Sequence, residues 1–333
     1  NVAVGYNSLT ANTAASYVTA LGGNALKANT TGSGNTAVGT NAMESNTTGA
    51  SNTVMGWNAL VTNTTGSNNL AMGVNTMFYN TTGYKNVALG DYGLWANTEG
   101  MENVAISGNG SLYKNTTGSQ NIAIGAASLY NNETGNYNIA IGRSSLYSNT
   151  ASNNVGIGHE SLRSNTTGNN NTASGYRGLY SNTTGSNNTA TGSVSLASNT
   201  TGNKNTATGD NALYTNTTGS SNTASGYRSL YSNTTGGLNT AVGHEALKAN
   251  TTASNNSAFG YQALNSNTTG DQNIAFGVGS LAGNTTATGN VAIGYLSLNT
   301  TTSGSNNTAI GDMAMYKNTG SHNLAIGGEA LKF

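Results

Sequence analysis

The 333-residue chain contains no cysteine and no proline, and only 7% of its residues are charged. The absence of cysteine excludes a disulfide framework and a thiolate metal site. Proline has no backbone N–H, so its absence suits strands in which nearly every N–H donates to a neighbour. The formal net charge is zero, and no basic patch of the kind that binds phosphate is visible. We therefore expect no nucleic-acid partner.

Long apolar runs are missing as well. None approaches the roughly 20 residues that span a bilayer, so we expect no membrane insertion by this segment. Apolar residues make up 35% of the chain, below the roughly 45–50% of ordinary globular domains, which excludes one large core. A composition this rich in Asn, Thr, Ser and Gly is compatible with disorder, but disorder would not demand the strict positional pattern of this sequence.

The pattern is a repeat of 17 residues, for which the stretch 205–221 is a representative unit. A phrase Asn-x-Ala-x-Gly recurs in about 20 units, and only the unit near Ser107 lacks its glycine. A short fixed period predicts a solenoid in which each unit contacts only its neighbours. We expect residues 1–333 to form a single continuous array within a longer fibrous protein, with caps or neighbouring domains outside this segment.

Two segments of each unit are too short for helices. The first is Asn-x-Ala-x, as in residues 121–124, and the second is a small residue followed by Leu, as in residues 128–130. Turns rich in Gly and Asn separate them, and both residues tolerate a positive φ. We predict an all-β fold, a parallel β-solenoid (β-roll) of about 20 rungs, with 17 residues and two short strands per rung; a rung is one repeat unit.

The narrow choice of residues at two positions predicts the interior. Ala stands two residues before the glycine, and Leu or Met stands four residues after it. Close packing imposes such a size filter, so we expect an Ala/Leu core that includes Ala123, Leu129, Ala207, Leu213, Ala224 and Leu230. The two neighbours of the Ala lie on the opposite strand face, and we interpret this face as one that meets another surface. The reverse assignment, with Ala outside, stays open.

Two Asn positions recur in almost every rung, one at the start of the first strand and one at the second turn. Parallel strands stack about 4.8 Å apart, so these amides can bond from rung to rung. We predict an asparagine ladder through the second position, which Thr301 interrupts; it includes Asn29, Asn46, Asn63, Asn182, Asn216, Asn233 and Asn267. The same residues open Asn-Thr-Thr sequons, but glycans one rung apart would collide, so we prefer the structural interpretation.

The register slips by one residue in three places. One residue is added within 107–110, one is lost within 150–154, and one is lost within 318–320. We expect small bulges or tightened turns at these places.

No catalytic or metal-binding pattern stands out. His159-Glu160 and His244-Glu245 lie five rungs apart without a third ligand at rung spacing, whereas a zinc site needs three or four convergent ligands. His322 stands alone. We expect exposed turns at these residues, no cofactor, no metal and no enzymatic activity.

Tyrosines follow the core Leu in many rungs, among them Tyr130, Tyr147, Tyr180, Tyr214 and Tyr231. We favour an aromatic stack from rung to rung that shields the coil edge or an interface between subunits. The alternative is a surface on which sugars stack. Pairs such as Thr30-Thr31 raise a further alternative, the binding of ice, although they lie on a turn and not on a flat strand.

The phrases Asn-Ile-Ala-Ile-Gly at 138–142 and Asn-Val-Ala-Ile-Gly at 290–294 resemble the head repeats of trimeric autotransporter adhesins. The chain is also similar to the Asn/Thr/Gly-rich shaft repeats of phage tail fibres and bacterial surface fibre proteins. The resemblance implies a left-handed parallel β-roll, usually with three chains side by side, that spaces or displays an adhesive tip. The period of 17 is longer than is typical of the adhesin heads.

We therefore expect a non-catalytic shaft or filament-forming segment of a fibre or adhesin that is extracellular or on a cell or virion surface. Self-association is the expected partnership, as a homotrimer or by lateral or longitudinal assembly, with a host-surface glycan or protein as a possible further partner. The alternative is a ligand-binding solenoid that recognises a surface glycan through its Tyr rows or ice through its Thr rows.

Overall fold

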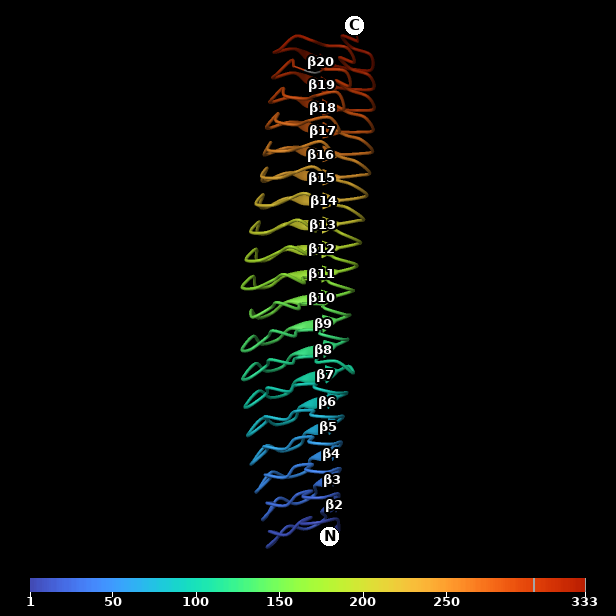
Figure 1. The fold of residues 1–333 in the computed structure, drawn as a ribbon. Helices are drawn as coiled ribbons and strands as arrows, with labels where there is room; N and C mark the ends of the chain where they lie inside the picture. Colours follow the sequence, from blue (N-terminus) through green and yellow to red (C-terminus); the bar gives the residue numbers. More distant parts are fainter. Residues whose placement is uncertain (302, 333) are drawn as a thin grey trace. The chain divides into compact units, whose positions relative to one another are not determined.

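A computed structural model describes residues 1–301 and 303–332. The regular elements of this described part are all three-residue strands, without a helix. They belong to two compact units, residues 1–169 and 170–333. Within each unit the strands form one column joined by turns (Figure 1). The predicted parallel β-solenoid of about 20 rungs and 17 residues per rung is confirmed, and its continuity over residues 1–333 stays a prediction.

The first unit contains ten strands, and each pairs in parallel with the next, for example Ala3 opposite Ala20 and Ala123 opposite Ala140. Their bounds are β1 (Val2–Val4), β2 (Thr19–Leu21), β3 (Thr36–Val38), β4 (Thr53–Met55), β5 (Leu70–Met72), β6 (Val87–Leu89), β7 (Val104–Ile106), β8 (Ile122–Ile124), β9 (Ile139–Ile141) and β10 (Val155–Ile157).

The second unit repeats the arrangement with ten more strands, paired in the same way, as in Ala207 opposite Ala224. Their bounds are β11 (Thr172–Ser174), β12 (Thr189–Thr191), β13 (Thr206–Thr208), β14 (Thr223–Ser225), β15 (Thr240–Val242), β16 (Ser257–Phe259), β17 (Ile274–Phe276), β18 (Val291–Ile293), β19 (Thr308–Ile310) and β20 (Leu324–Ile326).

The interior of each unit is a column of alanine and leucine side chains. The central Ala of the strand and the Leu that follows in the turn are fully buried, and this holds for Ala123, Leu129, Ala207, Leu213, Ala224 and Leu230. The two neighbours of each Ala point outward because side chains alternate along a strand. The assignment of Ala to the inside is therefore the one that the structure adopts.

The prediction of a second strand in each rung is wrong. Residues 126–131 form consecutive tight turns, and Leu129 has a φ of +49°. A strand requires a strongly negative φ, so this left-handed conformation prevents regular β structure. The segment still continues the stacking, since the Leu129 N–H donates to the Ser145 carbonyl of the next rung at 3.0 Å. Each rung therefore has one strand and a turn that hydrogen-bonds along the coil.

The predicted asparagine ladder is confirmed. Asn46 Nδ2 donates to Asn29 Oδ1 at 2.6 Å, and Asn63 Nδ2 donates to Asn46 Oδ1 at 2.7 Å. The same Nδ2 of Asn46 donates to the Gly49 carbonyl at 2.9 Å. In the second unit the row continues through Asn182, Asn199, Asn216, Asn233, Asn250, Asn267 and Asn284. We call these residues, with their equivalents in the first unit, the buried Asn row.

Thr301 interrupts this row as predicted. Its hydroxyl donates to the Asn318 carbonyl at 2.9 Å, and it has no amide to offer the preceding rung. The buried Asn284 Oδ1 consequently has no hydrogen-bond partner within the described residues. Leaving a buried acceptor unpaired costs about 1–3 kcal/mol, so this break is a weak point of the second unit.

The two lost residues shorten the turn after the buried Asn row, which confirms the expected tightening. Asn132 donates to the carbonyl of Gly135, three residues later, at 2.9 Å. At the first loss, Asn149 instead donates to Ala151, only two residues later, at 2.8 Å. Asn318 donates to Gly320 at 3.0 Å with the same spacing. The strands keep their register, so each slip is absorbed within its turn.

Candidate functional site

The tyrosines that follow the core Leu form a stack in the first unit. Trp95 lies 4.9 Å from Tyr113, Tyr113 lies 5.0 Å from Tyr130, and Tyr130 lies 5.3 Å from Tyr147, measured between ring centroids. The planes within each pair differ by 5°, 6° and 12°. Neighbouring rings therefore cover the faces of Tyr113 and Tyr130. This arrangement matches the favoured aromatic stack and leaves no room for a sugar between these rings.

Stacking also changes the chemistry of the central phenol. Partial burial raises the pKa of Tyr130, and the phenol groups of Tyr113 and Tyr147 raise it further. Each effect disfavours the phenolate. The hydroxyl therefore remains a neutral donor and acceptor.

The equivalent aromatic positions of the second unit are less regular. Tyr214 stacks on Tyr231 at 5.4 Å and 10°. The guanidinium of Arg177 lies 5.1 Å from the ring centre of Tyr180, and that of Arg228 lies 5.4 Å from that of Tyr231. Arginine thus packs against this row at separations typical of a cation–π contact.

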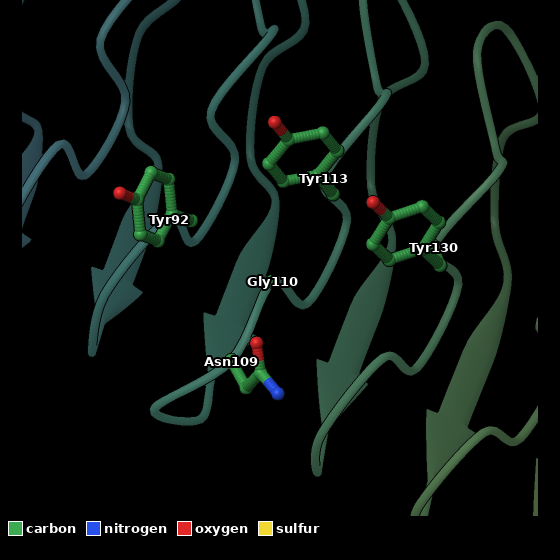
Figure 2. Close-up of a pocket in the computed structure, with 5 residues that line it drawn as sticks. All are labelled: Tyr92, Asn109, Gly110, Tyr113 and Tyr130. Atoms are coloured by element: carbon green, nitrogen blue, oxygen red, sulfur yellow. The ribbon is translucent and has the colours of Figure 1, made fainter.

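A hollow of about 180 Å³ lies beside the first stack, lined by Tyr92, Asn109, Gly110, Tyr113 and Tyr130. Figure 2 shows Tyr92 on one side of the loop that carries Asn109 and Gly110, with Tyr113 and Tyr130 above and beyond it. The loop is the one with the extra residue, and the added length projects Asn109 into solvent. The sequence predicted a bulge here but not the hollow.

A second aromatic row follows the turn glycine in the second unit. His244 lies between Tyr227 and Tyr261, at 5.1 Å and 5.2 Å. His244 lies on an exposed turn, as the sequence predicted, and its ring also packs between the two tyrosine rings. The signal was available, since Tyr227, His244 and Tyr261 occupy the same repeat position.

The charged groups beside this row are paired. Glu245 Oε1 accepts from Lys248 Nζ at 2.6 Å, and Glu245 Oε2 accepts from Gln262 at 3.1 Å. The hydrogen bond from Lys248 and then that from Gln262 lower the pKa of Glu245. In the other predicted pair, His159 Nδ1 lies 3.9 Å from Glu160 Oε2, while His322 is exposed. Nowhere in residues 1–301 and 303–332 do three His, Cys, Asp or Glu side chains converge as metal ligands.

The outward strand face is apolar at one position of every strand in the first unit and of β15 to β20, but it is hydroxylic in β11 to β14. In the first unit the residue after each central Ala (Gly156 in β10, Val54 in β4) is apolar in every strand; we call these residues the apolar strand row: Val4, Leu21, Val38, Met55, Met72, Leu89, Ile106, Ile124, Ile141 and Ile157. Leu21, Met55 and Ile157 are 46%, 42% and 40% exposed. In strands β11 to β14 both outward positions carry Thr or Ser.

The Thr-Thr pairs divide into two roles. Thr47 Oγ1 donates to the Thr64 carbonyl of the next rung at 3.0 Å, so the first Thr is engaged along the coil, while Thr48 is exposed. The Asn before the pair is buried in the asparagine ladder, out of reach of a glycosylating enzyme in the folded chain. The outward threonines of β12 and β13 are exposed, and their hydroxyls have no hydrogen-bond partner within the described residues. Ice binding stays a prediction, better suited to these strands than to the turns.

These features define a class, the parallel β-solenoid with internal side-chain ladders. Protein-family models gave no match to the chain, and a search of curated proteins found no relative. The resemblance to adhesin heads and fibre shafts therefore stays a prediction. None of the described residues forms a helix long and apolar enough to cross a bilayer.

Proposed function

We propose that this chain is a non-catalytic structural segment, a shaft or a filament-forming part of a fibre or adhesin on the outside of a cell or virion. Copies associate side by side, with the homotrimer as the expected assembly. The apolar strand row of the first unit carries this proposal. Soluble monomers rarely expose contiguous apolar surface of more than a few hundred Å², and this row places an exposed or half-buried apolar side chain on each of ten consecutive strands.

A second copy of the chain is the partner that fits this row. A partner that contacts the apolar side chain of every rung must repeat at the rung spacing, and another copy has that spacing by construction. The row contains no charged residue, so two copies can bury it without stranding a charge. Lateral association of this kind buries the row against an identical surface.

The direction of the internal hydrogen bonds supports a mechanical role. The buried Asn row and the hydroxyl of Thr47 bond to the neighbouring rung. These hydrogen bonds resist separation of neighbouring rungs. The stability of the array is the sum of the contributions of each rung and of its contacts with its neighbours. The resemblance to surface fibres supports the location outside the cell or on a virion.

The test is the mass of the full chain in solution, measured by light scattering together with sedimentation. We expect three times the mass of one chain for the unmodified protein. A triple variant in the apolar strand row (Met72→Thr, Ile141→Thr, Ile157→Thr) should be a monomer, because Thr is the residue at the equivalent position of β12 and β13.

The matched control removes exposed aromatic and apolar side chains elsewhere in the first unit (Trp57→Thr, Tyr84→Thr, Met101→Thr) and should remain a trimer. A folded monomer at all concentrations of the unmodified chain would contradict the proposed association. So would a row variant that keeps the mass of the unmodified protein.

A further inference from the structure

We propose that the hollow beside Tyr92 binds one ring of a neutral sugar, such as the terminal residue of a surface glycan. This goes beyond the structural role, because it assigns a ligand site to the single rung with an added residue. The repeat explains why the space exists. Tyr92 and Gly110 occupy the same position in consecutive rungs, with φ values of +59° and +65°. Because Gly110 has no side chain, the space beside the rings of Tyr113 and Tyr130, where a Cβ would lie 3.4 Å from each ring, stays open to the hollow.

Tyr92 differs from the stacked aromatic residues. Its ring lies 6.4 Å from that of Tyr113 and is tilted by 50°, so it does not continue the stack. The side chain is 41% exposed. A ring that departs from a stack at the wall of a hollow can pack against the C–H face of a sugar, as aromatic rings pack against other apolar faces.

The other groups that line the site are polar but uncharged. The side-chain amide of Asn109 and the hydroxyls of Tyr92, Tyr113 and Tyr130 have no hydrogen-bond partner within the described residues. Asp91, the carboxylate next to Tyr92, instead accepts a hydrogen bond from the Val74 N–H at 2.9 Å. The five lining residues are all uncharged. Unpaired amide and hydroxyl groups around an aromatic wall suit a polyhydroxylated ligand and offer no counter-charge to an ion.

The size of the hollow restricts the ligand. At about 180 Å³ it is smaller than the roughly 300–1,000 Å³ of most small-molecule sites, so it takes a single ring with the rest of the ligand in solvent. The small contact predicts weak binding, with a dissociation constant of about 1 mM or above for a free monosaccharide. Association of several chains would raise the avidity for a glycan surface.

The test titrates the full chain with free glucose, galactose, mannose, fucose, N-acetylglucosamine and N-acetylgalactosamine, followed by saturation-transfer NMR. We expect at least one of these sugars to bind. Tyr92→Ala and Asn109→Ala should each weaken that binding about tenfold or more. Gly110→Asn should abolish it by filling the hollow. Asn is a safe substitute there, because Asn58 and Asn75 hold this position at φ values of +54° and +53°.

The matched control is Tyr84→Ala, which removes a tyrosine of similar exposure (38%) outside the hollow and should bind as the unmodified chain does. Circular dichroism of each variant checks the fold. Absence of binding by all six sugars overturns the proposal, and so does binding that Tyr92→Ala and Gly110→Asn leave unchanged. The oligomeric mass is measured separately, so failure here leaves the structural proposal standing.

Discussion

The core leucine shows how a single residue shapes the rung. Leu or Met occupies this position in every rung, and Leu129, Leu213 and Met43 have φ values of +49°, +53° and +53°. A left-handed conformation costs about 1–2 kcal/mol for a residue with a side chain. Full burial of Leu returns about 1.5–3 kcal/mol, so burial offsets the strain. Val and Ile never occur here although they are common in the strands, because β-branched residues are genuine outliers at positive φ.

Two substitutions at Leu213 distinguish the effect of side-chain volume on stability from the effect of backbone strain. Leu213→Ile keeps the volume of the side chain, a change that ordinarily costs less than about 1.5 kcal/mol, but it adds a β-branch at positive φ, which costs roughly 1–3 kcal/mol more. Leu213→Met should cost less, since Met43 fills the equivalent position. Urea denaturation followed by circular dichroism measures both. Equal urea midpoints for the two variants would show that the positive φ of this residue does not restrict which side chains it accepts.

The same residue marks where prediction from sequence stops. The narrow range of side chains at two repeat positions identified Ala123 and Leu129 as interior residues, because close packing limits which side chains can occur there. It did not reveal that the segment around Leu129 is a turn, since apolar residues in short segments suit a strand equally well. The missing Val and Ile at this one position were the available signal.

At the scale of the element, the buried Asn row has one defect with a predictable repair. Thr301→Asn supplies the amide that Asn284 Oδ1 lacks and can accept in turn from Asn318. We expect the free energy of unfolding to increase by about 1 kcal/mol, the ordinary contribution of one hydrogen bond. The increase would reach up to about 3 kcal/mol where the buried acceptor carries its full desolvation penalty. Thermal and urea denaturation of the full chain provide the measurement.

Asn216→Thr is the matched opposite change, because it places the same break in an intact stretch of the row. It should destabilise the second unit by about 1–3 kcal/mol, since it leaves the Asn199 Oδ1 without a donor. If neither substitution moves the midpoint, the row would be a consequence of stacking and not a source of stability.

The buried Asn row was predicted from the sequence, but a further row of asparagines was not. Asn24, Asn41, Asn58 and Asn75 also bond from rung to rung, as in the 2.9 Å contact from Asn41 Nδ2 to Asn58 Oδ1. This row lies two residues after the turn glycine and covers only part of the first unit, so its short length hid it. The hollow beside Tyr92 was beyond prediction for a different reason. It depends on which side chains two consecutive rungs place next to each other.

At the scale of the whole molecule, the repeat predicts that rungs are interchangeable. A variant that lacks residues 205–221 joins Lys204 to Asn222 and restores the pattern of the unit. β12 would then pair with β14, which also has Thr, Ala and a hydroxyl residue. We expect an unchanged circular dichroism spectrum per residue and a nearly unchanged urea midpoint, because each rung contacts only its neighbours.

Removal of residues 205–212 is the control, since it takes away half a rung and places Leu213 where a strand should begin. This variant should show a lower midpoint and a broader transition. If the deletion of a complete rung were equally damaging, stability would depend on contacts beyond adjacent rungs.

The buried Asn row also gives each unit a polarity. In both units Nδ2 of the later residue donates to Oδ1 of the earlier one, as from Asn46 to Asn29 and from Asn233 to Asn216. The orientation is fixed because the same Nδ2 also donates to a carbonyl of its own rung. The amide dipoles therefore add along each row, as peptide dipoles do in a helix. Within each unit, one end of the row offers donors and the other offers acceptors, so copies of a unit joined end to end would match only head to tail, and the resulting filament would have a direction.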